Sequence, residues 1–248
     1  MEAVLDQLLN IGELLLQNGA EISRVEETIS RMGLAYGASE MHVFVITYSM
    51  VVTMRLADGT CLTQTRRIRQ PAGTDYFRLE ACNALSRRCC RAPVPLEELQ
   101  REVERIREQP RSRLQIYGGS MLAVGSFTLF FGGGAADMLV SMVFAAVTCL
   151  LQEYLMPVCM NRVIFNLICA LLIGLGTCGC VLLWPELHLE KIMGGYIMLL
   201  IPGLAMTNSI RDILVGNTIS GALLLTESLL WAGALASGFM LAIWITGV

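Results

Sequence analysis

The hydrophobic positions of this 248-residue chain follow two different patterns, one before and one after about residue 113. In the first part, apolar residues recur at helical or strand spacing between charged residues, as in a water-soluble domain. In the second part, nearly uncharged apolar stretches approach about 20 residues, the length at which a helix crosses a bilayer core of about 30 Å. The pattern therefore predicts a soluble domain over residues 1–110 and a transmembrane domain over residues 111–248.

The first 110 residues are predicted to form a small α+β domain. Asn18-Gly19 is a typical helix stop after one apolar stripe, and the segment from Ser23 to Glu26 has the spacing of a capping box. Asp58-Gly59, between two segments rich in strand-forming residues, is a strong hairpin signal. The predicted helices cover residues 2–17, 23–37, 75–91 and 95–108, and the predicted strands cover residues 41–56 and 60–67.

The second part is predicted to be an α-helical integral membrane domain with about five transmembrane helices. Pro202-Gly203 interrupts the fourth predicted span, and Glu227 is the one charged residue in the fifth. The predicted spans cover residues 114–131, 135–156, 163–184, 192–207 and 219–246.

Basic residues in the short loops favour an N-terminus in the cytoplasm and a C-terminus outside, because cytoplasmic loops carry an excess of Lys and Arg. Arg113 directly precedes the first span, as does Arg111. The loops that carry Arg162 and Arg211 fall on the same side, whereas the opposite side has Lys191 alone. The N-terminal segment lacks the basic start of a signal peptide. We therefore expect a multi-pass protein of the cytoplasmic membrane, in contact with the lipid bilayer.

Composition sharpens the division into two parts. The chain is 54% hydrophobic and 16% charged, whereas soluble domains average about 25% charged residues. Residues 1–113 hold 15 of the 18 basic residues and 15 of the 21 acidic ones. A break this sharp indicates a change of solvent. The near-zero charge of the first part offers no basic patch, so we expect no nucleic-acid partner.

Sequence motifs of enzymes and metal sites are missing. The chain has no Gly-rich loop ending in Gly-Lys-Ser/Thr, no Gly-x-Ser-x-Gly and no His-Glu-x-x-His. Its two histidines, His42 and His188, lie far apart in the sequence. The nine cysteines lack the paired spacing of a zinc site and are best interpreted as packing thiols. We expect no catalytic residues, no metal and no cofactor.

Charged residues inside the predicted spans are the first candidates for function. A charge at the bilayer centre costs at least about 2.5–3.5 kcal/mol, so such groups usually face a cavity or a partner. Glu227 lies about nine residues into the fifth span, which suits substrate binding or proton coupling; the alternative is a buried structural carboxyl. Asp137 and Glu153 lie nearer the ends of the second span, where they could bind a solute or sit at the membrane interface.

The interrupted fourth span supplies the second group of candidates. A break at Pro202-Gly203 frees backbone groups, which membrane proteins tolerate only where these line protein or water, as at transporter binding sites. A packing kink is the alternative. Asn208, Arg211 and Asp212 follow the break. Arg211 is suited to bind a carboxylate in a bidentate manner, or it could pair with Asp212.

Three sequence stretches together resemble the N-terminal module of the threonine/serine exporter (ThrE) family. They are Leu16-Gln-Asn18-Gly19-Ala-Glu21-Ile-Ser-Arg24-Val-Glu26, Phe130-Phe131-Gly132-Gly133 with Asp137, and Ile201-Pro202-Gly203 with Asn208-Ser209-Ile-Arg211-Asp212. The resemblance covers residues 5–246 in order. It implies a secondary exporter of small amino acids such as threonine and serine, or of dicarboxylates such as succinate. It also implies a second, smaller membrane module, here expected as a separate partner subunit.

The favoured hypothesis is a subunit of a secondary transporter that is coupled to protons. Glu227 would serve coupling or the substrate ammonium, and Arg211 with Asn208 would bind the substrate carboxylate. The segment from Asn18 to Glu26 is either a helix-capping turn or a gate at the substrate path. The alternative hypothesis is a membrane-anchored enzyme or sensor that acts through residues 1–110. Both hypotheses are compatible with a homo-oligomer.

Overall fold

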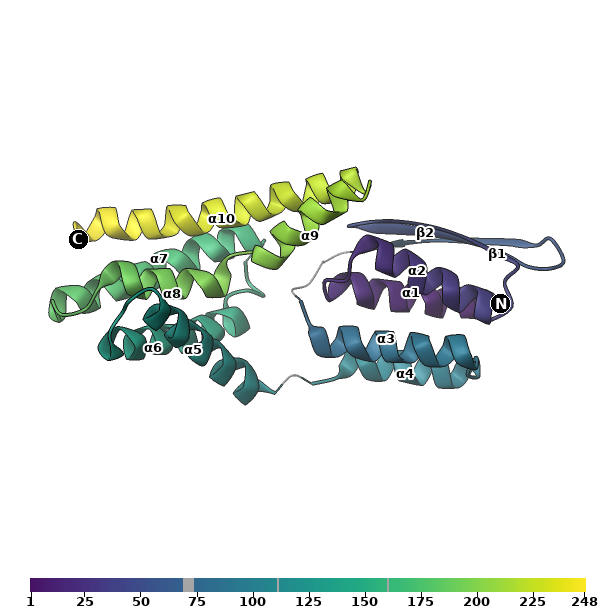
Figure 1. The fold of residues 1–248 in the computed structure, drawn as a ribbon, viewed down its shortest axis with the longest axis horizontal. Helices are drawn as coiled ribbons and strands as arrows, with labels where there is room; N and C mark the ends of the chain where they lie inside the picture. Colours follow the sequence, from purple (N-terminus) through teal and green to yellow (C-terminus); the bar gives the residue numbers. More distant parts are fainter. Residues whose placement is uncertain (69–73, 111, 160) are drawn as a thin grey trace. The chain divides into compact units, whose positions relative to one another are not determined.

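The computed structural model describes residues 1–68, 74–110, 112–159 and 161–248. The chain divides into two compact units (Figure 1). Unit 1 consists of residues 1–110 and 207–225, and unit 2 consists of residues 111–206 and 226–248. The short segment 207–225 thus belongs with the N-terminal residues, although the sequence predicts it as part of the transmembrane domain.

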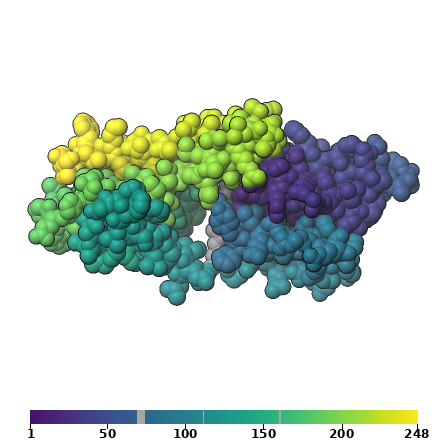
Figure 2. Space-filling view, in the orientation of Figure 1, coloured from purple at the N-terminus to yellow at the C-terminus, as the bar shows by residue number. Residues whose placement is uncertain are grey.

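Unit 1 contains four N-terminal helices and a three-stranded antiparallel sheet of order β1-β2-β3. Helices α1 and α2 pack on the sheet, and the α3–α4 pair packs on α1 and α2 from the other side (Figure 1). The space-filling view shows α3 and α4 as one continuous surface of this unit (Figure 2). The elements are α1 (Glu2–Gln17), α2 (Ile22–Ala35), β1 (Glu40–Ile46), β2 (Ser49–Arg55), β3 (Cys61–Arg67), α3 (Tyr76–Arg91) and α4 (Leu96–Glu108).

The sheet differs from the sequence prediction at one turn. The predicted strand 41–56 is a hairpin of β1 and β2, because Ile46 pairs with Ser49 and the chain reverses at Thr47-Tyr48. No described non-glycine residue has a positive φ, so this turn is not of the primed type that Asn-Gly or Asp-Gly would announce. The Asp58-Gly59 turn joins β2 to β3, as predicted.

The core of unit 1 comes from the apolar stripes read in the sequence. Leu5, Leu8 and Leu15 of α1 are fully buried, and the inward side chains of β2 alternate with outward ones, as in a sheet with one covered face. Arg66 of β3 fastens the sheet to α1: its guanidinium donates to Asp6 (2.7 Å) and to Glu13 (3.2 Å).

The cysteines of α3 lie partly in this core. Burial raises the pKa of the Cys82 thiol to about 12, so at neutral pH this group stays protonated and unreactive. Cys89 is also buried and contacts the Tyr36 hydroxyl (3.6 Å). Among the described residues, no three His, Cys, Asp or Glu side chains are grouped closely enough to hold a metal ion.

Every secondary-structure element among the described residues of unit 2 is a helix. Its complete helices are α5 (Arg113–Phe130), α6 (Ala135–Tyr154), α7 (Arg162–Leu183) and α8 (Leu189–Leu200). Helices α9 (Gly203–Leu214) and α10 (Thr218–Thr246) contribute residues to both units. The core joins Val124, Phe165 and Tyr196 with Leu235 and Phe239.

Three described helices, α6, α7 and α10, are long and apolar enough to cross a membrane. The pair α8 and α9, bent by 52° at the break between them, counts as a fourth span if it is taken as one. The sequence predicts five. The first predicted span, 114–131, is α5, which has only 18 residues and includes Arg113 and Gln115 in its first turn. These two residues lower its average hydropathy below that of the other spans.

Candidate functional site

The predicted site residues fall in both units, and each unit is described by itself. Asn208, Arg211 and Asp212 belong to unit 1, and the other predicted site residues belong to unit 2. The set in unit 2 is Asp137, Glu153, Pro202, Gly203 and Glu227. The site residues are therefore examined as two separate groups.

In unit 1, Arg211 of α9 forms an ion pair with Glu21, 190 positions away in the sequence. Glu21 is the residue that precedes α2. Asp212, next to Arg211, is 5% exposed and lies close enough to both for their charges to act on its carboxyl group. The cluster thus holds two carboxylates around one guanidinium. Asn208 lies one turn before Arg211, on the same face of α9.

A tightly held turn presents Glu21 to Arg211. The Asn18 side-chain amide donates to the carbonyl of Leu14 (2.6 Å), and the carbonyl of Asn18 accepts from the Asp75 N–H (3.2 Å). Gly19 has a φ of +87° and lies against Thr74, so a larger residue there would be strained. Asp75 in turn caps α3 by accepting from the Phe77 N–H (3.1 Å). Residues 18–21 thus form a capping turn, and Glu21 at the end of this turn pairs with Arg211.

Helix α9 follows the break at Pro202-Gly203, which the sequence predicts. Pro202 has no N–H to continue the helical ladder, and Gly203 donates to the nearby carbonyl of Ile201 (2.8 Å). The two helices meet at 52°. Gly221 of α10 then allows α9 to approach closely, because a Cβ there would lie 2.6 Å from the carbonyl oxygen of Ser209.

In unit 2, Asp137 forms hydrogen bonds at the start of α6 and just before α8. It is 1% exposed and accepts hydrogen bonds from the backbone N–H groups of His188 and Gly134 (2.8 Å each). The His188 Nδ1 atom lies 3.1 Å from its second oxygen. Asp137 therefore caps α6 and binds the segment that leads into α8. A role in transport stays a prediction.

Glu153 lies at the end of α6 and forms an ion pair with Arg113 at the start of α5 (3.4 Å). Its side chain is 27% exposed. This pair joins two antiparallel helices at one end, and a role of Glu153 in transport or at the membrane interface stays a prediction.

Glu227 lies nine residues after Thr218, the start of α10, at about the depth that the sequence predicts. It is half-buried, its neighbour Ser228 is fully buried, and only Thr226 precedes it in the part of α10 that belongs to unit 2. Helix α10 has 29 residues, about 43 Å at 1.5 Å per residue, which exceeds a bilayer core of about 30 Å. The first turns of α10 therefore need not lie in lipid.

Unit 2 contains a buried cluster of hydroxyl groups that the sequence analysis does not predict. Thr148 of α6 donates to the Tyr196 hydroxyl of α8 (2.7 Å), which also contacts the Cys169 thiol of α7 (3.4 Å). Thr128 of α5 donates to Ser141 of α6 (2.9 Å). Ser141 and Thr148 are seven residues apart and therefore share a helix face, a signal that the sequence did contain. Such bonds fasten helices where no water is present.

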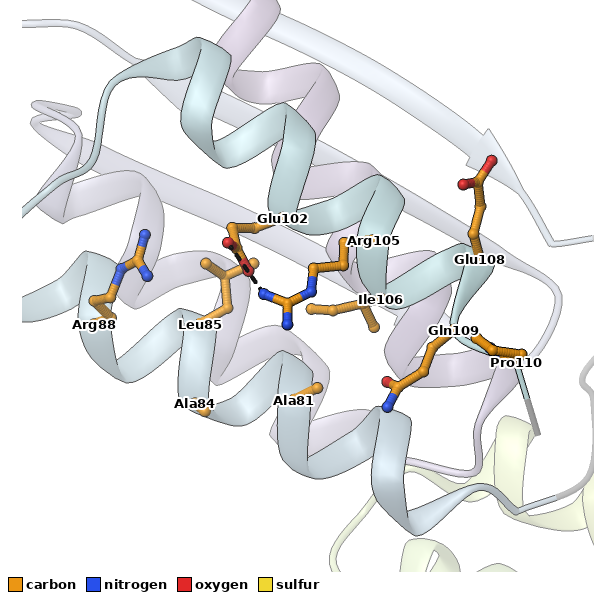
Figure 3. A pocket seen from close by; sticks show the side chains of 10 residues that line it. All are labelled: Ala81, Ala84, Leu85, Arg88, Glu102, Arg105, Ile106, Glu108, Gln109 and Pro110. Carbon is orange, nitrogen blue, oxygen red and sulfur yellow. Dashed lines mark ion pairs between the residues drawn. The ribbon is translucent and has the colours of Figure 1, made fainter. Parts of the chain in front are cut away.

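Unit 1 also has a surface groove between α3 and α4, with a volume of about 650 Å³ (Figure 3). Leu85 and Ile106 form its apolar floor. Arg88 lines its edge and pairs with Glu98 of α4, and Arg105 pairs with Glu102 (3.7 Å). Both arginines thus already have carboxylate partners.

Comparison with known proteins identifies the family. The sequence model of the ThrE family, described as "Putative threonine/serine exporter", matches residues 6–246, almost the whole chain. The chain belongs to the ThrE family. It is a multi-pass membrane protein of an exporter family, in agreement with the apolar helices described above.

Two ThrE relatives have described activities. The "Threonine/serine exporter" of Corynebacterium glutamicum is 20% identical over 253 residues, which cover 99% of this chain and 52% of that protein. The "Probable succinate transporter subunit YjjP" of Escherichia coli (strain K12) is 38% identical over 65 residues, 26% of this chain and 25% of that protein. This chain therefore spans about half the length of the Corynebacterium protein. No solved structure matches it.

Proposed function

We propose that this chain is one subunit of a secondary transporter that exports small amino acids such as threonine and serine, or dicarboxylates such as succinate. The observation that carries the proposal is the family match over residues 6–246. One similar protein is named as a threonine/serine exporter of about twice this length, and another is named as a transporter subunit. A second, smaller membrane subunit would supply the remaining module.

The Glu21–Arg211 ion pair supports five transmembrane spans. Both residues belong to unit 1, and an ion pair requires both side chains to lie on the same side of a membrane. The chain between them must then cross an even number of times. Helices α6 and α7 and the bent pair α8–α9 give three crossings, so a fourth is required, and α5 is the helix that remains. Helix α10 would be the fifth span.

Contacts within unit 2 agree with this count. Arg113 at the start of α5 pairs with Glu153 at the end of α6, so these helices run antiparallel along each other. Asp137 at the start of α6 contacts His188 after the end of α7, as expected if those two ends share one side. With the N-terminus in the cytoplasm, as the loop arginines favour, the C-terminus lies outside.

The neighbourhood of α7 and α10 supports the direction of the fifth span. A Cβ at Gly238 of α10 would lie 2.6 Å from the carbonyl of Leu167, and one at Gly174 would lie close to Ala242. Residue numbers therefore rise together along the two helices, which makes them parallel. In a five-span topology the third and fifth spans cross in the same direction, as these two helices do.

The proposed roles follow from charge. Arg211, with Asn208 one turn away, would bind the substrate carboxylate at the cytoplasmic mouth. Glu227 would take up the coupling proton or contact the substrate ammonium near the start of the fifth span. The Pro202-Gly203 break would let α9 change its angle to α8 during transport. Asp137 and Glu153 would hold helix ends in place.

Reconstitution tests the proposed function. The chain is incorporated into liposomes together with the product of a gene for a small, four- or five-span membrane protein from the same genome. Efflux of labelled threonine, serine and succinate is measured with and without a proton gradient. We expect efflux of at least one substrate that requires both proteins. Liposomes with both proteins that release all three substrates no faster than empty ones would overturn the proposal.

A further inference from the structure

The segment from Asn18 to Glu21 makes the contact on which the inference rests. Its helix-capping function accounts for Asn18 and Gly19 but not for Glu21, whose carboxylate pairs with Arg211. Glu21 is the N-cap residue of α2, but its side chain forms no hydrogen bond to the first turn of this helix. A carboxylate at this position therefore has a long-range partner and no capping role of its own.

The turn holds Glu21 firmly, whereas its partner sits on a short helix between two interruptions. Asn18 is 2% exposed and is bonded on both its side chain and its carbonyl. Helix α9 has 12 residues, begins after the break at Pro202 and ends before Gly216, which has a φ of +98°. Rotation at either interruption would carry Arg211 toward or away from the Glu21 carboxylate.

The Glu21–Arg211 ion pair is weak enough for another carboxylate to replace Glu21. Its side chains are 59% exposed for Arg211 and 28% exposed for Glu21, and ion pairs in contact with water are weak. Arg211 contacts Glu21 through one nitrogen, and a small carboxylate from solution can bind the same guanidinium in a bidentate manner. Asp212 is buried next to Arg211, so this guanidinium has a second carboxylate close by.

We propose that Glu21 is a gating residue that competes with the carboxylate of the substrate for Arg211. Without substrate, the Glu21–Arg211 pair holds α9 against the turn between α1 and α2. A carboxylate substrate at the cytoplasmic mouth replaces Glu21 and releases α9 to move at the Pro202-Gly203 break. The competition between Glu21 and the substrate carboxylate rests on the proposed function. The Glu21–Arg211 ion pair does not depend on it.

The variant Glu21→Gln removes the competing carboxylate. It is made in the full chain and reconstituted with the second, smaller membrane subunit. The half-saturating substrate concentration for efflux should fall about two- to fivefold, the range that corresponds to a weak exposed ion pair. A structural role for Glu21 would lower the maximal rate instead. The matched control is Glu27→Gln, which breaks an exposed pair with Arg31 in the same helix (2.6 Å) and should change neither quantity.

A second measurement does not depend on transport. Phenylglyoxal modifies accessible arginines, and mass spectrometry gives the rate of modification at Arg211. We expect faster modification in Glu21→Gln than in the wild type, and protection of Arg211 by millimolar threonine or succinate in that variant. Glu27→Gln should leave the rate at Arg211 unchanged.

The outcomes separate the two proposals. If the wild type shows no efflux but Arg211 is shielded by Glu21, the proposed function fails and the pair stands. If efflux is present, the gate is overturned when Glu21→Gln leaves the half-saturating concentration and the modification rate unchanged. It is also overturned when the half-saturating concentration rises, because Glu21 would then bind the substrate.

Discussion

Replacement of Arg211 by alanine is expected to lower efflux of carboxylate substrates at least tenfold at concentrations below saturation. Hydrogen bonds to charged groups contribute about 1.5–3 kcal/mol, which corresponds to a factor of roughly ten to a hundred in affinity. In the unoccupied protein Arg211 has Glu21 as a partner, so the variant also releases the contact between α9 and the α1–α2 turn. The loss should appear mainly as a higher half-saturating concentration.

Two further variants make this result specific to Arg211. Arg211→Lys keeps the charge but loses the planar fork, so an intermediate loss is expected. Arg31→Ala removes another exposed arginine of unit 1, which pairs with Glu27 in its own helix, and this variant should transport normally. If Arg211→Ala retains the wild-type half-saturating concentration, the carboxylate site lies elsewhere.

Replacement of Gly195 by alanine is expected to destabilise unit 2 more than any other single methyl addition in α8. A Cβ at this position would lie 2.8 Å from the backbone nitrogen of Thr128, and backbone cannot move aside as a side chain can. Overpacking of this kind costs about 1–3 kcal/mol. It would also disturb the bond from Thr128 to Ser141. The measurement is the melting temperature of the purified full chain in detergent, with the fraction that elutes as a single species.

The neighbouring glycine provides the control. A Cβ at Gly194 would meet ring atoms of Phe131 no closer than 3.4 Å, an ordinary contact. Gly194→Ala should therefore melt within a few degrees of the wild type, while Gly195→Ala melts clearly lower or elutes as aggregate. Equal melting temperatures for the two variants would mean that α8 and α5 do not approach as closely as described.

Much of unit 1 could be predicted because its elements follow local rules. The helix predicted over 2–17 is α1 with the same bounds, and Asp58-Gly59 is the turn between β2 and β3. The turn at Thr47-Tyr48 could not be read, since its residues have ordinary φ angles and carry no turn signature. The β1–β2 pairing was therefore merged into one predicted strand.

Membrane spans are harder to count from hydropathy alone. Helix α5 is short and begins with polar residues, and its packing against α6 is visible only in the structure. The sequence predicts a cytoplasmic loop between residue 207 and residue 219, whereas the structure continues α9 to Leu214 and begins α10 at Thr218. The structure groups residues 207–225 with unit 1, and Glu227 lies just beyond this segment, in the part of α10 that belongs to unit 2.

The candidate site was predicted in part. The sequence identified Arg211 and the break at Pro202, since both are unusual within apolar segments. Glu21 lies in the segment that the sequence offers as a capping turn or a gate, but its pairing with Arg211 could not be predicted, because the two residues are 190 positions apart. Tyr196 and Thr148 were missed for a similar reason, as each forms its bond with a residue on another helix.

The side of the membrane on which the α9–α10 turn lies tests the Glu21–Arg211 contact and the five-span topology most directly. Cys90, exposed on α3, and cysteines introduced as Val215→Cys and Val248→Cys are treated with a membrane-impermeant maleimide in right-side-out and inside-out vesicles, and the labelled peptides are identified by mass spectrometry. We predict that Cys90 and residue 215 react only in inside-out vesicles, and residue 248 only in right-side-out ones. Labelling of residue 215 from the side opposite to Cys90 would contradict the Glu21–Arg211 contact and the five-span topology with it.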